Sequence, residues 1–448
     1  MKTADIVILG GSAAGITAAL TARRHYPQKS VLVIRQEKEV LIPCGIPYIF
    51  GTVGSPSKNL IPDALVEKAS VEILLAEVRS LDPDRKTVET SQGPVGYDKL
   101  VMATGSLPSV PPIPGTDLPG VYPIAKDVPS LLALQEELGR AKDVVIIGGG
   151  FIGIEFADEI RKAGVDNVTI VEIAPHCLSL SYDTVFCEEA EEALKGRGIQ
   201  IRTSTKVQAI QGQGHVERAL LVDGSTLKAD VVILGAGAIP NVKIAQAAGL
   251  VLGATGAIKV DRTMRTSVPD VFACGDCAKK FSFFGGRPST LKLASIATLE
   301  ARIAGANLYG ITRENCGTIG VWSTAIGDLA LGTAGLTESA AVGEGYEVVT
   351  ATVEGPNRHP GGMPGGAPMK VKLVFERNSG VLLGGQVRGN SAAGELLNVM
   401  AACVQQRMTA EDIAMFQMGT HPALTASPVA YPLTNAAEIA IGAMRNRC

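Results

Sequence analysis

The sequence of 448 residues predicts an α/β protein with two Rossmann-like dinucleotide-binding domains. Two observations carry this prediction. An apolar strand, a glycine-rich turn and a helical pattern follow one another at residues 5–25, and the same order returns at residues 143–160. Such a turn lets the backbone approach a pyrophosphate, whose negative charge meets the helix N-terminus. The length agrees, because chains of this size usually divide into two or three domains.

The first turn, GGSAAG, departs from the G-x-G-x-x-G pattern at one position. Gly10 and Gly15 hold the outer glycine positions, whereas Ser12 holds the middle one. Alone, such a match is weak evidence for a nucleotide site. The next apolar strand ends in Arg35 and not in an acid. This leaves open whether one of the two residues after it contacts a ribose or Arg35 itself lies beside the adenosine.

The second turn carries all three glycines, Gly148, Gly150 and Gly153. The strand that follows ends in Glu172, 19 residues beyond the last glycine (172 − 153 = 19). An acid at about this distance can accept a hydrogen bond from a ribose 2′-hydroxyl. No Lys or Arg follows in EIAPHCL, so a 2′-phosphate would meet only negative charge. We therefore expect NADH here in preference to NADPH; a turn without a ligand is disfavoured because strand, glycines, helix and acid coincide.

The composition limits which binding partners and which cellular compartment we expect for the protein. The 41 Lys and Arg residues nearly balance the 44 Asp and Glu residues, which argues against nucleic acid or an anionic membrane as a partner. No apolar run reaches the roughly 18 residues of a membrane span, and the first residues do not resemble a signal peptide. The eight cysteines are scattered, which favours reduced thiols. We expect a soluble cytoplasmic protein.

Further motifs make the chain similar to the flavoprotein disulfide reductases that carry two dinucleotide folds, over essentially its whole length. The segment YDKLVMATGSLPSVPPIPG resembles the crossover between the two domains of that family, and VVILGAGAIPN resembles the return. VPDVFACGDCA is similar to the second FAD motif, and STAIGDLALGTAGLTE to the start of the dimerisation domain. The resemblance implies an enzyme in which one domain holds FAD and the other delivers a nicotinamide to it.

The same resemblance implies the domain organisation. An FAD-binding domain would comprise residues 1–115 and 250–322, an NAD-binding domain residues 116–249, and an α+β dimerisation domain residues 323–448. In this family the C-terminal segment completes the site of the partner subunit, so we expect a homodimer.

The resemblance also assigns cofactor contacts by position. Asp276 would bind the ribityl chain of FAD, and Phe151 matches an aromatic position that covers the flavin until the nicotinamide displaces it; ordinary helix–sheet packing is the equal alternative for Phe151. The helix expected over residues 291–308 would direct its N-terminus at the flavin pyrimidine. The FAD residues are Gly10, Gly11, Ser12, Ala13, Ala14, Gly15, Arg35, Pro43, Val78, Ala103, Thr104, Gly105, Gly275, Asp276 and Ala294. The NAD residues are Gly148, Gly150, Phe151, Ile152, Gly153, Glu155, Glu172, Gly235 and Gly237.

A lone cysteine, Cys44 in VLIPCGIPYIF, indicates the branch of the family. A C-x4-C pair would need a cysteine at Ile49, and a C-x-x-C pair one at Pro47. PCGIPY instead resembles the single-cysteine branch, which contains coenzyme A disulfide reductases, polysulfide or persulfide reductases, NADH oxidases and NADH peroxidases. There a lone thiolate attacks an external sulfur. The positive end of a helix begun at Pro43 or Gly45 could help to lower the pKa of that thiol.

Two other parts of the sequence help to distinguish the enzymes within this branch. The oxidases and peroxidases place a histidine in the first glycine turn, and GGSAAG has none, which argues against a peroxidase and less firmly against an oxidase. The stretch GTHPALTASPVAYP offers His421 as an acid–base group and Tyr431 as a hydrogen-bond donor to sulfur. The alternatives are a turn-capping histidine and a surface tyrosine.

We therefore expect an NADH-dependent flavoprotein that reduces a disulfide, persulfide or polysulfide through Cys44, with coenzyme A as a candidate partner. An NADH oxidase, or a flavin redox sensor or electron-transfer protein, is the alternative. The C-x-x-C pair of Cys274 and Cys277 invites a metal site. It has no second pair, and the Gly-Asp between the two cysteines is assigned to FAD, so we expect no metal.

Overall fold

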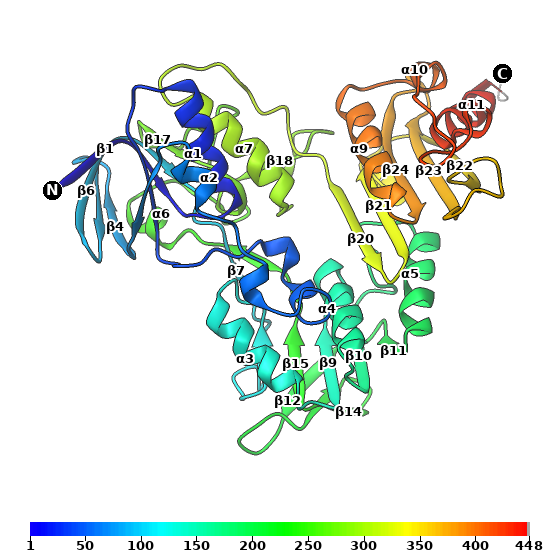
Figure 1. Cartoon of the computed structure of the whole chain (residues 1–448), viewed down its shortest axis with the longest axis horizontal. Coiled ribbons are helices and arrows are strands. Elements are labelled where there is room, and N and C mark those ends of the chain that lie inside the picture. Colours follow the sequence, from blue (N-terminus) through cyan, green and yellow to red (C-terminus); the bar gives the residue numbers. More distant parts are fainter. Residues whose placement is uncertain (446–448) are drawn as a thin grey trace. The chain divides into compact units, whose positions relative to one another are not determined.

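The computed structural model describes residues 1–445 and divides into two compact units (Figure 1). Unit 1 comprises Met1–Pro112, Gly120–Arg140 and Ala236–Thr318. Unit 2 comprises Ile113–Pro119, Ala141–Gly235 and the chain from Ile319 onward. The domain boundaries expected from the sequence stay a prediction.

Unit 1 is built on a sheet whose central strands are parallel. Strand β1 (Lys2–Leu9) lies between β2 (Val31–Arg35) and β6 (Gly93–Met102), which both run parallel to it. All five residues of β2 are buried, as expected for a parallel strand covered on both faces. Helices α1 (Ala13–His25) and α7 (Ala294–Ala306) pack against each other. The strand order is β3-β2-β1-β6-β5-β4, with β17 paired to β6.

The remaining strands of unit 1 are β3 (Glu72–Leu75), β4 (Val78–Asp82), β5 (Thr87–Thr90), β7 (Ser106–Pro108), β8 (Val121–Pro123), β16 (Ala238–Pro240), β17 (Val271–Ala273), β18 (Lys280–Phe281) and β19 (Pro288–Ser289). Its other helices are α2 (Ala64–Glu67), α3 (Val128–Leu138) and α6 (Lys243–Ala247). The 3-10 turns are η1 (Pro43–Gly45), η2 (Pro47–Ile49), η3 (Pro56–Lys58) and η4 (Gly275–Cys277). Strands β7 and β16 form a separate antiparallel pair.

The first half of unit 2 repeats the parallel arrangement. Four parallel strands follow the order β11-β10-β9-β15. They are β9 (Asp143–Ile147), β10 (Asn167–Val171), β11 (Ile199–Arg202) and β15 (Val231–Leu234), with helices α4 (Phe151–Lys162) and α5 (Thr184–Gly196). A small antiparallel sheet consists of β12 (Val207–Gln211), β13 (Arg218–Leu221) and β14 (Thr226–Lys228).

The second half of unit 2 is α+β. An antiparallel sheet of order β20-β21-β24-β23-β22 contacts α9 through β21 and β24, and α11 through β22 and β23 (Figure 1). The strands are β20 (Val321–Ile326), β21 (Leu329–Gly335), β22 (Val348–Pro356), β23 (Pro368–Glu376) and β24 (Leu382–Gly389). The helices are α8 (Glu338–Gly343), α9 (Ala392–Gln405), α10 (Ala410–Ala414), η5 (Pro428–Ala430) and α11 (Pro432–Arg445). The predicted fold class, two Rossmann-like folds and an α+β region, is confirmed.

The helices of the described chain are short. The longest, α9 and α11, have 14 residues each. Within residues 1–445, none is both long and apolar enough to cross a membrane.

The two glycine-rich turns close by the same steric contact. Gly10 and Gly148 take φ values of +114° and +110°, which side chains strongly disfavour. A Cβ on Gly15 would lie 1.8 Å from the carbonyl oxygen of Gly10, and a Cβ on Gly153 would lie 1.9 Å from that of Gly148. The third glycine of each motif is therefore required for the strand and the helix to meet.

We expect Gly153→Ala to lower the free energy of unfolding by about 2 kcal/mol or more, because the new methyl group overlaps a backbone carbonyl. Gly150→Ala is the matched control in the same turn. Its φ is −75° and a Cβ there has open space within 4 Å, so the change should stay within about 1 kcal/mol. Urea unfolding of the two variants measures the difference. Equal losses would contradict this account of the turn.

Candidate active site

Cys44 lies at the middle of η1 in unit 1 with an exposed side chain. The helix expected to begin at Pro43 or Gly45 is not an α-helix. It consists of two 3-10 turns, in which the N–H of Ile46 donates to the carbonyl of Pro43 at 3.3 Å. An α-helical bond to that carbonyl would have to come from residue 47, and Pro47 has no N–H. A turn this short supplies no helix dipole of the expected size.

Asn59 braces the Cys44 turn, and sequence reasoning missed it. This residue is 5% exposed. Its side-chain Nδ2 donates to the carbonyl of Ile42 at 2.9 Å, and its own carbonyl accepts from the N–H of Ile42 at 2.9 Å. A Cβ on Gly45 would lie 2.0 Å from Asn59 Oδ1. Asn59 thus binds the residue before the η1 turn through two hydrogen bonds and leaves no room for a side chain at Gly45. A single asparagine in a loop gave no sequence signal for this role.

Arg35 lies beside the first glycine turn, and its place beside the adenosine stays a prediction. A Cβ on Gly11 would lie 2.5 Å from Arg35 Cδ. The Arg35 guanidinium is 2% exposed and binds Asp63 in two parallel hydrogen bonds of 2.6 and 2.7 Å. Among the described residues, its Nε is buried without a partner. An orphaned donor beside a glycine cradle fits a bound nucleotide.

The expected FAD segments converge on the same turn. A Cβ on Gly10 would lie 2.2 Å from the carbonyl oxygen of Ala103, which begins the Ala-Thr-Gly crossover. A Cβ on Gly275 would lie 2.9 Å from Ala14 Cβ and 3.6 Å from Ala297 Cβ on α7. The chain therefore leaves no room for side chains where three FAD motifs meet. This glycine-lined cradle fits the dinucleotide that the sequence predicted.

Asp276 follows Gly275 and points into a polar cluster that the sequence did not predict. Ser106 Oγ donates to Asp276 Oδ2 at 2.7 Å, and Lys126 Nζ donates to Ser106 Oγ at 3.0 Å. Lys126 Nζ also lies 3.8 Å from Asp276 Oδ2. Four other expected FAD residues lie at the beginnings of helices or strands. Ser12 occupies the N-cap position of α1 without a side-chain hydrogen bond, Pro43 is the first residue of η1, and Ala294 is the first residue of α7. Val78 is the first residue of β4 and packs against the core.

Glu172 follows β10 directly and lies at the second glycine turn. Its Oε2 accepts from the N–H of Gly149 at 2.5 Å and its Oε1 from the N–H of Ala174 at 2.7 Å. Gly150 caps α4 at its N-terminus. Gly235 lies next to this turn, since a Cβ on Gly148 would lie 2.6 Å from the Gly235 carbonyl oxygen. Gly237 instead belongs to unit 1, where its carbonyl accepts from the N–H of Ser109.

Phe151 opens α4 in an aromatic cluster. Its ring stacks on Trp322 of β20 at 5.5 Å between centroids and 21° between planes, and it lies 6.0 Å from Tyr182. One turn later, Glu155 accepts from Thr324 Oγ1 at 2.8 Å. Burial raises the pKa of the Glu155 carboxyl to about 7, while this hydrogen bond pulls it down. Trp322 and Thr324 come from a strand far along the chain, so sequence spacing could not pair them with α4.

His421 and Tyr431 flank the turn before α11. The N–H of Ala423 donates to His421 Nδ1 at 3.2 Å, which leaves the proton of a neutral imidazole on Nε2. This contact is the turn-capping alternative, yet Nε2–H remains available as a donor from an exposed side chain. Tyr431 is partly exposed, and burial raises the pKa of its hydroxyl.

Cys274 and Cys277 are packing residues in the structure. Both are 0% exposed, and burial raises the pKa of each thiol. Cys277 Sγ donates to the carbonyls of Cys274 at 3.3 Å and Met102 at 3.5 Å.

Comparison with known proteins places these features in a family. Residues 4–301 match the model of the pyridine nucleotide-disulphide oxidoreductases, and residues 321–430 match the dimerisation domain of that family. The chain is 34% identical to the NAD(P)H coenzyme A polysulfide/persulfide reductase of Pyrococcus horikoshii, over 97% of this chain and 98% of that one. It is 31% identical to the NADH oxidase of Methanocaldococcus jannaschii, over 98% and 99%.

A solved structure gives the same result. The NAD-dependent persulfide reductase from A. fulgidus superposes with a TM-score of 0.91 at 29% identity, covering 99% of this chain and 84% of that one. The sequence similarity, the shared fold and the two glycine-lined turns agree. The chain therefore belongs to the pyridine nucleotide-disulphide oxidoreductase family, which uses FAD and NAD(P)H.

Proposed function

We propose that this protein is an NADH-dependent flavoprotein that reduces a disulfide, persulfide or polysulfide through Cys44, in a homodimer. The observation that carries the proposal is the exposed thiol of Cys44 on a turn that Asn59 braces. Relatives named as coenzyme A-dependent sulfur reductases support it, as does the match to the dimerisation domain. A coenzyme A disulfide or persulfide is the substrate class that these names favour.

The chemistry assigned to Cys44 is a thiol–disulfide exchange. Its thiolate attacks one sulfur of a substrate R–S–S–R, so that the bond between Cys44 Sγ and that sulfur forms while the substrate S–S bond breaks. The other half leaves as RS⁻ and takes up a proton. FAD, when bound, supplies the two electrons from NADH that return Cys44 to the thiolate and release the second RS⁻.

The leaving thiolate needs a proton donor, and the C-terminal segment offers two candidates. His421 carries its proton on the exposed Nε2. Tyr431 presents a hydroxyl that is protonated at neutral pH and can donate to sulfur. We assign this step to the C-terminal segment of the partner subunit, with Tyr431 as the main donor.

A second function, an NADH oxidase, is favoured by the relative of that name in Methanocaldococcus jannaschii. Ser12, Ala13 and Ala14 fill the first glycine turn and offer no imidazole. For this reason sulfur reduction ranks first.

Anaerobic half-reactions test the proposal. NADH should bleach the flavin absorbance of the holoenzyme, and coenzyme A disulfide or polysulfide should restore it. In Cys44→Ser we expect bleaching as before and reoxidation by sulfur at least about 100-fold slower, because a nucleophile is lost. Cys316→Ser changes the other exposed cysteine of residues 1–445; it is the matched control and should behave as wild type. Reoxidation by oxygen alone would establish the oxidase instead.

Glu172→Gln should weaken the preference for NADH. The variant removes the charge that accepts from a ribose 2′-hydroxyl and repels a 2′-phosphate, so the ratio of kcat/KM for NADH to that for NADPH should fall about tenfold or more. Glu188→Gln, an exposed glutamate on α5, serves as control and should leave the ratio unchanged. An unchanged ratio in Glu172→Gln would remove Glu172 from the nucleotide site.

Tyr431→Phe should slow sulfur reduction by about 100-fold, the usual contribution of a general acid, while NADH still bleaches the flavin at the wild-type rate. His421→Gln should have a smaller effect, since its imidazole also caps a turn. Stopped-flow reoxidation measures both, with Tyr346→Phe as the control in the same unit. A full rate in Tyr431→Phe would rule out this tyrosine as the donor.

A further inference from the structure

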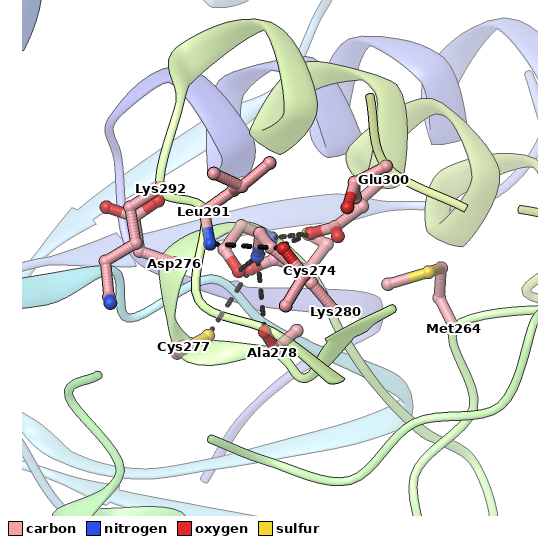
Figure 2. A network of polar contacts seen from close by, with 12 residues as sticks. Met264, Cys274, Asp276, Cys277, Ala278, Lys280, Leu291, Lys292 and Glu300 are labelled. Carbon is pink, nitrogen blue, oxygen red and sulfur yellow. Dashed lines mark hydrogen bonds and ion pairs between the residues drawn. The ribbon is translucent and has the colours of Figure 1, made fainter. Parts of the chain in front are cut away.

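Unit 1 contains a fully buried ion pair next to the FAD motif. The side chains of Lys280 and Glu300 are 2% and 0% exposed, and Lys280 Nζ lies 3.2 Å from Glu300 Oε2. Figure 2 shows Lys280 between the turn that carries Cys277 and Ala278 on one side and Glu300 of α7 on the other. Lys280 lies outside the motifs that the sequence identified, and Glu300 lies in the helix expected over residues 291–308, where sequence reasoning assigned it no role.

Both side chains bind the backbone of the η4 turn. The N–H of Gly275 donates to Glu300 Oε2 at 2.9 Å. Lys280 Nζ donates to the carbonyl of Gly275 at 2.6 Å and to that of Ala278 at 3.2 Å. Glu300 and Lys280 therefore hold the N–H and the C=O of one residue, which fixes both peptide planes around Gly275.

Gly275, whose peptide planes are fixed in this way, directly precedes Asp276 in the chain. Gly275 has a φ of +78° and packs against Ala14 of the first glycine turn. A rotation of either peptide plane would turn the Asp276 carboxylate away from its position 2.7 Å from Ser106 Oγ. Figure 2 shows Asp276 near Lys292, on the other side of the cluster from Glu300; the Asp276 side chain is partly exposed, whereas that of Glu300 is fully buried.

Stability alone does not account for a buried ion pair at this place. Desolvation offsets much of the attraction, and apolar side chains of similar size are often as stable or more so. Burial raises the pKa of Glu300 to about 7, against the opposing charge of Lys280 and the Gly275 N–H. Among the described residues, Glu300 Oε1 has no hydrogen-bond partner. Burying this ion pair costs free energy, and both of its side chains form hydrogen bonds with the η4 turn, which contains Asp276.

We propose that Lys280 and Glu300 are positioning residues for FAD: they hold the Gly275 peptides so that the Asp276 carboxylate meets the ribityl chain. The inference rests on the assignment of Asp276 to FAD and goes beyond the proposed sulfur chemistry. Each side chain acts through the backbone of Gly275, with which it forms a hydrogen bond.

FAD binding to the apoprotein tests the inference. The double variant Lys280→Met/Glu300→Leu keeps the charge balanced and fills the space with apolar atoms. We expect its apoprotein to unfold at a temperature close to that of wild type, while the Kd for FAD, measured by quenching of flavin fluorescence, rises at least about tenfold. The visible circular dichroism of the bound flavin should change as well, because the ribityl contact is displaced.

Two further variants separate positioning from simple structure. Glu300→Gln keeps an acceptor for the Gly275 N–H and should retain a Kd within about threefold of wild type. Lys2→Met/Glu72→Leu removes an exposed ion pair of the same unit and should leave FAD binding unchanged. If the first double variant does not fold, Glu300→Gln is compared with Glu300→Leu in its place, and only the latter should lose affinity.

Two results would overturn the inference. One is a double variant that binds FAD within twofold of wild type; the other is Glu300→Gln losing as much affinity as the apolar replacement. All readouts use FAD alone, without a sulfur substrate. The inference can therefore fail while the sulfur chemistry stands, and the reverse is equally possible.

Discussion

The close approach of backbone to backbone at the two glycine-rich turns is the constraint on which the rest of the structure depends. In each motif the third glycine contacts the carbonyl of the first, and no side chain fits between them. The same lack of side chains lets later segments approach: the Ala103 carbonyl reaches Gly10, and the Gly235 carbonyl reaches Gly148. Segments far apart in the sequence are thereby brought to the end of a central strand, where dinucleotides bind in such folds.

The sequence predicted those parts of the site that depend on local spacing. The order of strand, glycines and helix is a property of neighbouring residues, and so is the distance from Gly153 to Glu172. The structure places the Glu172 carboxylate beside Gly149, and its contact with a ribose stays a prediction. The fold class followed from the same patterns and from the motifs of the family. These features need no knowledge of what packs against them.

The parts that sequence reasoning missed depend on contacts between distant residues. Lys280 meets Glu300, and Thr324 meets Glu155, only after the sheets have formed. From the sequence alone, such charged or polar residues are expected at the surface, because no neighbouring residue indicates that they are buried. The helix expected at Cys44 failed for a local reason that the sequence did contain: Pro47 removes the donor that an α-helical turn would need.

Family membership does not by itself separate the oxidases from the sulfur reductases, since relatives of both names match nearly the whole chain. The distinction then falls on a few side chains placed on a common scaffold. Here they are the residues of the first turn, which lack an imidazole, the exposed Cys44, and the hydroxyl of Tyr431. In the function that we propose, the shared scaffold fixes where electrons enter, and these positions decide which acceptor can take them.

The stacking of Phe151 on Trp322 has a practical consequence. The chain contains one tryptophan, so all of its indole emission originates at Trp322 of β20, which stacks on the first residue of α4. The Phe151 ring, stacked at 5.5 Å, forms part of the surroundings of this partly exposed indole, to which its emission responds. Movement of Phe151 away from the indole would therefore change the intrinsic fluorescence of the unmodified protein, and this signal would test whether Phe151 moves when a nicotinamide binds.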